Sequence, residues 1–128
     1  MDDLVIIAVD FDGVLVTDEF PLVGKPIWGN IIKVITAQKA GCKTILWTCR
    51  VGDKLDDAVK FCESNGLKFD AVNDNVAENK EEFGNNPRKV FAHIYIDDRS
   101  VERVMDTLPG HYVVPDFLRR IRTWLKAR

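Results

Sequence analysis

The sequence is poor in the residues that stabilise extracellular domains or hold soft metal ions. It has only three cysteines, Cys42, Cys49 and Cys62, and they form no Cys-x-x-Cys pair. An odd number of isolated cysteines supports neither a disulfide scaffold nor a structural zinc site, and is typical of a reducing compartment.

The sequence also has no excess of one charge and no long hydrophobic run. Its 18 Lys plus Arg residues nearly balance its 20 Asp plus Glu residues, giving a formal charge of -2. This balance does not indicate nucleic acid or a membrane surface as a partner. The apolar run near the start is too short for a membrane span and lacks the basic flank of a signal peptide. We therefore expect a cytoplasmic protein without a membrane partner.

Short apolar stretches alternate with amphipathic helical patterns along the chain. Its 128 residues, 46% hydrophobic and 30% charged, suit a single domain over residues 1–128. Strands are expected at 4–9, 43–47, 69–72, 90–96 and 111–114, and helices at 27–41, 53–65, 76–83, 101–108 and 116–125. This alternation predicts an α/β fold: a three-layer Rossmann-like domain whose mostly parallel five-stranded sheet has helices on both faces.

The run Leu4–Val9 predicts a strand buried on both faces, and two carboxylates follow it. Ligands of open α/β sheets lie beyond the carboxyl ends of the strands, so Asp10 and Asp12 are expected at the mouth of a site. Gly13 allows a tight turn beside them. Taken alone, the stretch is equally typical of a strand that ends in an ordinary Asp-Gly turn.

Other predicted strands also end in polar residues, which belong to the same edge of a parallel sheet. The second strand leads to Thr48 and the fourth to Asp97 and Asp98. Four carboxylates in one place repel one another unless a cation lies among them, and oxygen ligands favour Mg²⁺. Such a site leaves positions for phosphate oxygens, which backbone N–H groups, the Thr48 hydroxyl and a lysine would also bind.

Four motifs resemble those of the haloacid dehalogenase (HAD) superfamily, in that family's order and over nearly the whole chain. They are Asp10-Phe11-Asp12-Gly13-Val14, Ile45-Leu46-Trp47-Thr48, Lys89 and Ile94-Tyr95-Ile96-Asp97-Asp98. The resemblance implies a HAD-like fold and Mg²⁺-dependent hydrolysis of a phosphomonoester.

The resemblance also implies roles for the carboxylates. Asp10 would attack phosphorus and form an aspartyl-phosphate, while Asp12 would protonate the leaving oxygen and later activate water. Mg²⁺ would be held by a carboxylate oxygen of Asp10, the backbone carbonyl of Asp12 and the acidic pair. Asp98 is favoured as the direct ligand, with Asp97 acting through water, although the two could exchange.

The remaining motif residues would bind the phosphoryl group. Thr48 and the Cys49 backbone N–H would contact its oxygens, together with the turn at Gly13. Lys89 would neutralise developing charge, and Lys80 is the alternative for this role.

Three neighbouring side chains have two interpretations each. Arg50 could contact substrate, but a surface ion pair with a carboxylate is favoured. The Cys49 thiol could resemble a nucleophile, but we expect it to pack. Trp28 could be a platform for substrate, but a packed position on a helix face is favoured.

Residues 13–26 and 73–88 are too short for the cap domain of larger HAD members. Residues 13–26 instead predict a short flap or hairpin. Capless members often act on bulky phosphates and use the flap or a neighbouring subunit to shield the site, so a homo-oligomer is possible. A phosphotransferase with the same residues, a receiver-like phosphoacceptor domain and a non-catalytic binding module are the alternatives.

Overall fold

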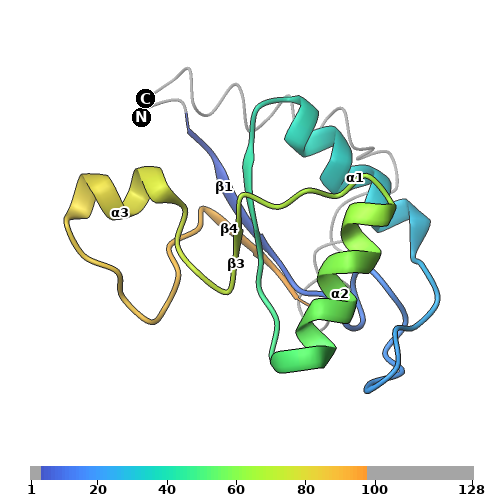
Figure 1. Ribbon diagram of the computed structural model, residues 1–128. Coiled ribbons are helices and arrows are strands. Elements are labelled where there is room, and N and C mark those ends of the chain that lie inside the picture. Colours follow the sequence, from blue (N-terminus) through green and yellow to red (C-terminus); the bar gives the residue numbers. More distant parts are fainter. Residues whose placement is uncertain (1–3, 98–128) are drawn as a thin grey trace.

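A parallel sheet with β1 in its interior organises the computed structural model, which describes residues 4–97. Its strands are β1 (Ile6–Val9), β2 (Lys43–Leu46), β3 (Ala71–Val72) and β4 (Ile94–Ile96), in the order β3-β2-β1-β4 (Figure 1). The helices are α1 (Trp28–Lys39), α2 (Gly52–Ser64) and α3 (Ala77–Phe83). The α/β class and the parallel sheet are thereby confirmed, with four strands among the described residues. The predicted fifth strand and the last two helices lie outside them.

The sequence of β1 explains its central position. Its four side chains are at most 2% exposed, because it has a strand on either side and apolar groups against both faces. Ile7 and Val9 belong to a core with α1 and α2, whereas Ile6 and Ala8 belong to a second core on the opposite face. An uninterrupted apolar run is what a strand buried on both faces requires.

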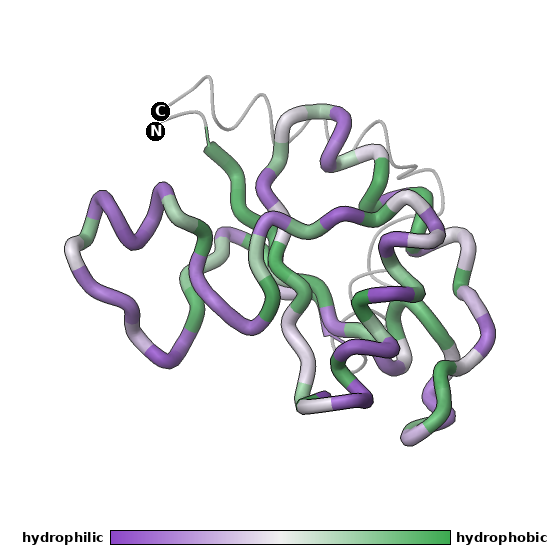
Figure 2. Tube along the Cα trace, in the orientation of Figure 1, coloured by the Kyte–Doolittle hydropathy of each residue, from purple (hydrophilic) through white to green (hydrophobic). Residues whose placement is uncertain are grey.

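Helices α1 and α2 both cover the first of these faces (Figure 1). α1 contributes Ile31, Val34 and Ala37, and α2 contributes Ala58 and Cys62. Figure 2 shows the strands in hydrophobic colours and much of the outer side of α2 as hydrophilic. None of the helices within residues 4–97 is long and apolar enough to cross a bilayer.

The second face is covered by residues from 73–92, where irregular chain on both sides of α3 is ordered by a buried asparagine. Asn75 is 1% exposed, and its Nδ2 donates to Asn86 Oδ1 (2.8 Å) and to the Pro87 carbonyl (3.1 Å). Its Oδ1 accepts from the Phe91 N–H (2.6 Å). One side chain thus replaces the backbone hydrogen bonds that a regular element would supply.

Some predicted boundaries are wrong for identifiable reasons. The fourth strand, expected from residue 90, begins at Ile94, because the Phe91 N–H bonds to Asn75 and the Ala92 N–H to the Tyr95 hydroxyl. The helix expected from residue 53 begins at Gly52, and Val51, the residue before it, makes no side-chain capping bond. The third strand is shorter than expected, whereas the helix expected at 76–83 is confirmed as α3.

We predict that Asp74 stabilises the fold at neutral pH and not in acid. Hydrogen bonds from Asn86 and from Lys80 hold the pKa of the Asp74 carboxyl below its ordinary value of 3.8. A carboxyl whose pKa is lower in the folded protein than in the unfolded chain stabilises the fold. This stabilisation is complete above the ordinary pKa and is lost as the pH falls through the folded-state pKa. Because the side chain is 44% exposed, the effect should stay below about 1 kcal/mol.

Urea denaturation of wild type and Asp74→Asn measures this contribution. The variant should be less stable at neutral pH, and the difference should shrink when the pH is brought below the ordinary pKa of 3.8. Asp56→Asn, which alters an exposed carboxylate on α2, is the control. A stability difference that is the same at both pH values would contradict the assignment.

Candidate active site

Asp10 is fixed at the carboxyl end of β1 by the sheet itself. Its backbone N–H donates to the Ile96 carbonyl (2.8 Å), which extends the β1–β4 pairing beyond the last residue of β1. Its carboxylate Oδ1 accepts from the Phe11 N–H (2.7 Å), and the side chain is half-buried. Backbone bonds therefore set both the position and the orientation of this carboxylate.

The chain turns sharply directly after these residues. Gly13 has a φ of 85°, a conformation that favours glycine. The N–H groups of Val14, Leu15 and Val16 all point at the Phe11 carbonyl, at 3.2, 2.9 and 3.3 Å. The Gly13 N–H donates to the Val16 carbonyl (2.8 Å), which closes the turn.

A small flap follows the turn, as the sequence predicts. The Thr17 N–H donates to the Lys25 carbonyl (2.8 Å), and Thr17 Oγ1 accepts from the Lys25 N–H (2.8 Å). An antiparallel bridge joins Val16 to Pro26. A Cβ on Gly24 would lie 1.9 Å from the Thr17 carbonyl oxygen, so glycine is required where the two strands of the flap meet.

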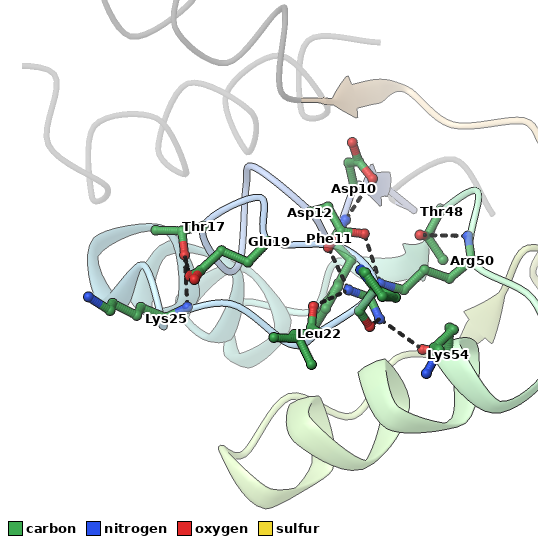
Figure 3. A network of polar contacts seen from close by, with 11 residues as sticks. Asp10, Phe11, Asp12, Thr17, Glu19, Leu22, Lys25, Thr48, Arg50 and Lys54 are labelled. Atoms are coloured by element: carbon green, nitrogen blue, oxygen red, sulfur yellow. Dashed lines mark hydrogen bonds and ion pairs between the residues drawn. The ribbon is translucent and has the colours of Figure 1, made fainter.

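Asp12 forms a buried, two-pronged ion pair with Arg50. Arg50 Nε donates to Asp12 Oδ2 (2.8 Å) and Arg50 Nη2 donates to Asp12 Oδ1 (2.7 Å). The arginine side chain is 1% exposed and the aspartate side chain 18%. The sequence predicts a surface ion pair for Arg50, and the structure places that pair in the interior. In Figure 3 Asp12 faces the guanidinium, whereas the carboxylate of Asp10 points away from it.

All five N–H donors of Arg50 have partners within the protein. Besides the two bonds to Asp12, Nη2 donates to the Leu22 carbonyl (2.8 Å), and Nη1 to those of Lys54 (3.2 Å) and Pro21 (3.4 Å). A guanidinium has no further donors, so in this arrangement Arg50 has none for a substrate oxygen. Asp12 is the main reason that the pKa of Arg50 is raised.

Aromatic rings enclose the same guanidinium. The Arg50 Cζ lies 5.0 Å from the centre of the Phe11 ring and 5.1 Å from that of Phe20. Cations are attracted to ring faces at this distance, and the attraction strengthens where water is excluded. Phe20 comes from the flap, so the flap, the turn after β1 and the start of α2 all meet at one side chain.

Thr48 lies at the end of the neighbouring strand β2 and is held by a residue that the sequence analysis missed. The Thr48 N–H donates to Asn73 Oδ1 (2.8 Å), and Thr48 Oγ1 accepts from the Arg50 N–H (3.2 Å). Asn73 has a φ of 50° and follows β3. An asparagine directly after a strand indicates the left-handed backbone conformation. It does not indicate that the asparagine side chain bonds to the Thr48 N–H.

The acidic pair is described only in part. Asp97 directly follows β4, which pairs with β1, so Asp97 and Asp10 lie at adjacent strand ends. Asp98 lies outside the described residues. Within residues 4–97 no three acidic, histidine or cysteine side chains form a group that could hold a metal.

The two candidate lysines have different neighbours. Lys80 Nζ pairs with Asp74 Oδ2 (3.0 Å) beyond the end of β3. Lys89 is exposed, and its Nζ lies 5.8 Å from the centre of the Tyr95 ring on β4. Tyr95 pairs in register with Ala8, two residues before Asp10.

Two packing predictions near the site are wrong. The Cys49 side chain is exposed, because the chain leaves the sheet immediately after Thr48. Trp28 is 53% exposed, since it is the first residue of α1 and the face of α1 that contacts the core begins at Ile31.

We predict that Arg50→Met lowers the free energy of unfolding by about 3 kcal/mol, because it leaves Asp12 without its buried partner. Urea denaturation measures the loss. Arg88→Met, at an exposed arginine, should change stability little. The double variant Asp12→Asn/Arg50→Met should lose less than the sum of the two single variants, and strict additivity would argue against the pair.

We also predict that Cys49 and Cys62 differ sharply in reactivity. Burial raises the pKa of the Cys62 thiol to about 12, so at pH 8 it is protonated as well as covered. A disulfide reagent should modify Cys49 rapidly in the native protein and Cys62 only after unfolding. Mass spectrometry of wild type and Cys49→Ser locates the label, and rapid native labelling of Cys62 would refute this.

Comparison with known proteins gives a relative of known structure. No protein-family model and no curated protein match the sequence. A solved structure of a conserved protein from Bacteroides thetaiotaomicron is similar to this chain, with 31% sequence identity and a TM-score of 0.67. The match covers 88% of this chain and 95% of that one. With that identity over nearly the full length of both proteins, the chain belongs to the family of this conserved Bacteroides protein.

Proposed function

We propose that the protein is a Mg²⁺-dependent phosphatase of the HAD type that works through an aspartyl-phosphate on Asp10. One observation carries the proposal. Asp10 follows the interior strand β1, and the strands paired with β1 lead into Thr48 on one side and Asp97 on the other. Two carboxylates and a hydroxyl are therefore brought to one edge of the sheet, which supports their roles as nucleophile, metal ligand and phosphate-binding group.

The chemistry begins with Asp10. Its carboxylate attacks phosphorus, the bond to the leaving oxygen breaks, and water later releases phosphate from the aspartyl group. The hydrogen bond from Phe11 to Oδ1 supports this role, because it fixes the rotation of the carboxylate before the substrate arrives. Thr48, held through Asn73, would donate its hydroxyl to a phosphoryl oxygen.

Mg²⁺ would be held by Asp10, the backbone carbonyl of Asp12 and the pair Asp97 and Asp98. Oxygen donors at two adjacent strand ends are of the type that Mg²⁺ prefers, and Asp98 would complete the set. The ion would supply positive charge against the phosphoryl oxygens.

The order of the strands favours this assignment over a receiver-like domain. In receiver-type sheets the first and third strands are neighbours, at the point where the strand order reverses. Here β3 pairs with β2 alone among the described strands and leads into Asn73, not aspartate. The carboxylates follow β1 instead.

We predict that Asp10→Asn abolishes phosphate release from an aryl phosphate, because an amide is a poor nucleophile. Asp18→Asn, which alters an exposed carboxylate of the flap, should retain wild-type activity. Addition of EDTA should stop the reaction, and excess Mg²⁺ should restore it. Full activity of Asp10→Asn would refute the role of the nucleophile.

We predict that Lys89→Ala slows the reaction by about 10² or more, the scale on which removal of one charge-stabilising group acts. Lys80→Ala should leave kcat nearly unchanged, because its ammonium is paired with Asp74. Comparing kcat of the two variants decides between the lysines. A slow Lys80→Ala beside a normal Lys89→Ala would reverse the assignment.

A further inference from the structure

Asn73 lies at the same edge of the sheet as the residues of the proposed active site. The strands in the order β3-β2-β1-β4 lead into Asn73, Thr48, Asp10 and Asp97, respectively. A phosphoryl group bound by Asp10 and Thr48 would therefore have Asn73 on the side away from Asp97. The proposed chemistry gives Asn73 only the task of holding Thr48, and uses one of the two polar atoms of its side chain.

Two hydrogen bonds fix Asn73 against the end of β2. Its backbone N–H donates to the Leu46 carbonyl (2.8 Å), and its Oδ1 accepts from the Thr48 N–H (2.8 Å). Its φ of 50° is a conformation that asparagine adopts more readily than most residues. The backbone and the side chain of Asn73 are thus both held in place before any ligand binds.

The orientation of the Asn73 amide follows from the chemistry of its partner. A backbone N–H can bond only to an acceptor, so Oδ1 must face Thr48 and the Nδ2 amino group must lie on the other arm of the amide. Within residues 4–97 the two N–H groups of Nδ2 donate to no other residue, and the side chain is half-buried. Nδ2 is therefore available to a ligand that lies beside Thr48.

The Thr48 hydroxyl is oriented in a similar way. Its Oγ1 accepts from the Arg50 N–H (3.2 Å), so its own proton points elsewhere. In the part of the chain that the structure describes, this hydroxyl donates to no protein group. Thr48 and Asn73 thus present two donors that are held by other hydrogen bonds, and such preorganised donors suit the oxygens of an anion.

We propose that Asn73 is a phosphate-binding residue whose Nδ2 donates a hydrogen bond to a phosphoryl oxygen beside Thr48. This inference rests on the proposed phosphatase function, which puts phosphorus next to Asp10. Arg50 cannot supply this donor, because all five of its N–H groups already have partners in the protein. A neutral amide that is already in position stabilises charge on the oxygen without rearrangement during the reaction.

Asn73→Asp separates the two roles of this side chain. Aspartate has the same shape, accepts φ values of this kind and keeps an oxygen for the Thr48 N–H, but it replaces Nδ2 by an acceptor. We expect urea denaturation to give nearly wild-type stability. Isothermal titration with inorganic phosphate in the presence of Mg²⁺ should show an affinity lower by about tenfold or more, the scale of one hydrogen bond to a charged group.

Two controls separate the lost donor from the added charge. Asn85→Asp, at an exposed asparagine, makes the same change in net charge and should keep the wild-type affinity for phosphate. The titrations are repeated in about 1 M NaCl, where charges are screened beyond about 3 Å. The difference between wild type and Asn73→Asp should persist there. Its disappearance would show that repulsion alone weakens binding, and would overturn the inference.

Asn73→Gly removes the donor without adding a charge. Glycine adopts the φ of this position readily, but it also loses the acceptor for the Thr48 N–H. We expect this variant to bind phosphate weakly as well. Wild-type affinity in Asn73→Gly would overturn the inference. So would wild-type affinity in Asn73→Asp beside weak binding in Asn73→Gly, because Asn73 would then act only through Thr48.

Failure of the underlying function gives a different result. If wild type neither binds phosphate nor releases it from p-nitrophenyl phosphate, the proposed function falls and this inference with it. If Asp10-dependent release occurs and Asn73→Asp keeps the wild-type kcat/KM and phosphate affinity, the function stands and only the inference falls.

Discussion

The buried pair between Asp12 and Arg50 is the interaction on which the candidate site depends. It joins the turn after β1 to the chain leaving β2, across a separation of 38 residues. The same guanidinium bonds to carbonyls of the flap and of the first turn of α2. A buried arginine needs a partner for every donor, so each of these segments is constrained by the others.

This constraint gives two carboxylates that are close in sequence different environments. Asp10 continues the hydrogen-bond pattern of the sheet and points away from Arg50 (Figure 3). Asp12 lies in the turn and is neutralised by the guanidinium. The proposed nucleophile Asp10 and its neighbour Asp12 therefore have different surroundings, and the pairing with Arg50 accounts for the difference.

Asparagines have a comparable role on the other side of the sheet. Asn73 fixes the backbone of Thr48, and Asn75 orders the segment that covers the second face of the sheet. Both residues follow β3, a short strand that within residues 4–97 pairs with β2 alone. Amide side chains can donate and accept at once, so they stabilise irregular backbone where a helix or strand cannot form.

The sequence by itself determined the parallel sheet, the buried β1, the flap and the convergence of strand ends, because apolar periodicity and turn residues report burial locally. Only the tertiary structure decided that Arg50 is interior, that Cys49 is exposed and that Asn73 supports Thr48. These outcomes depend on which distant groups meet after packing. A charged residue after a strand has the same local pattern whether it faces solvent or a carboxylate brought to it by the fold.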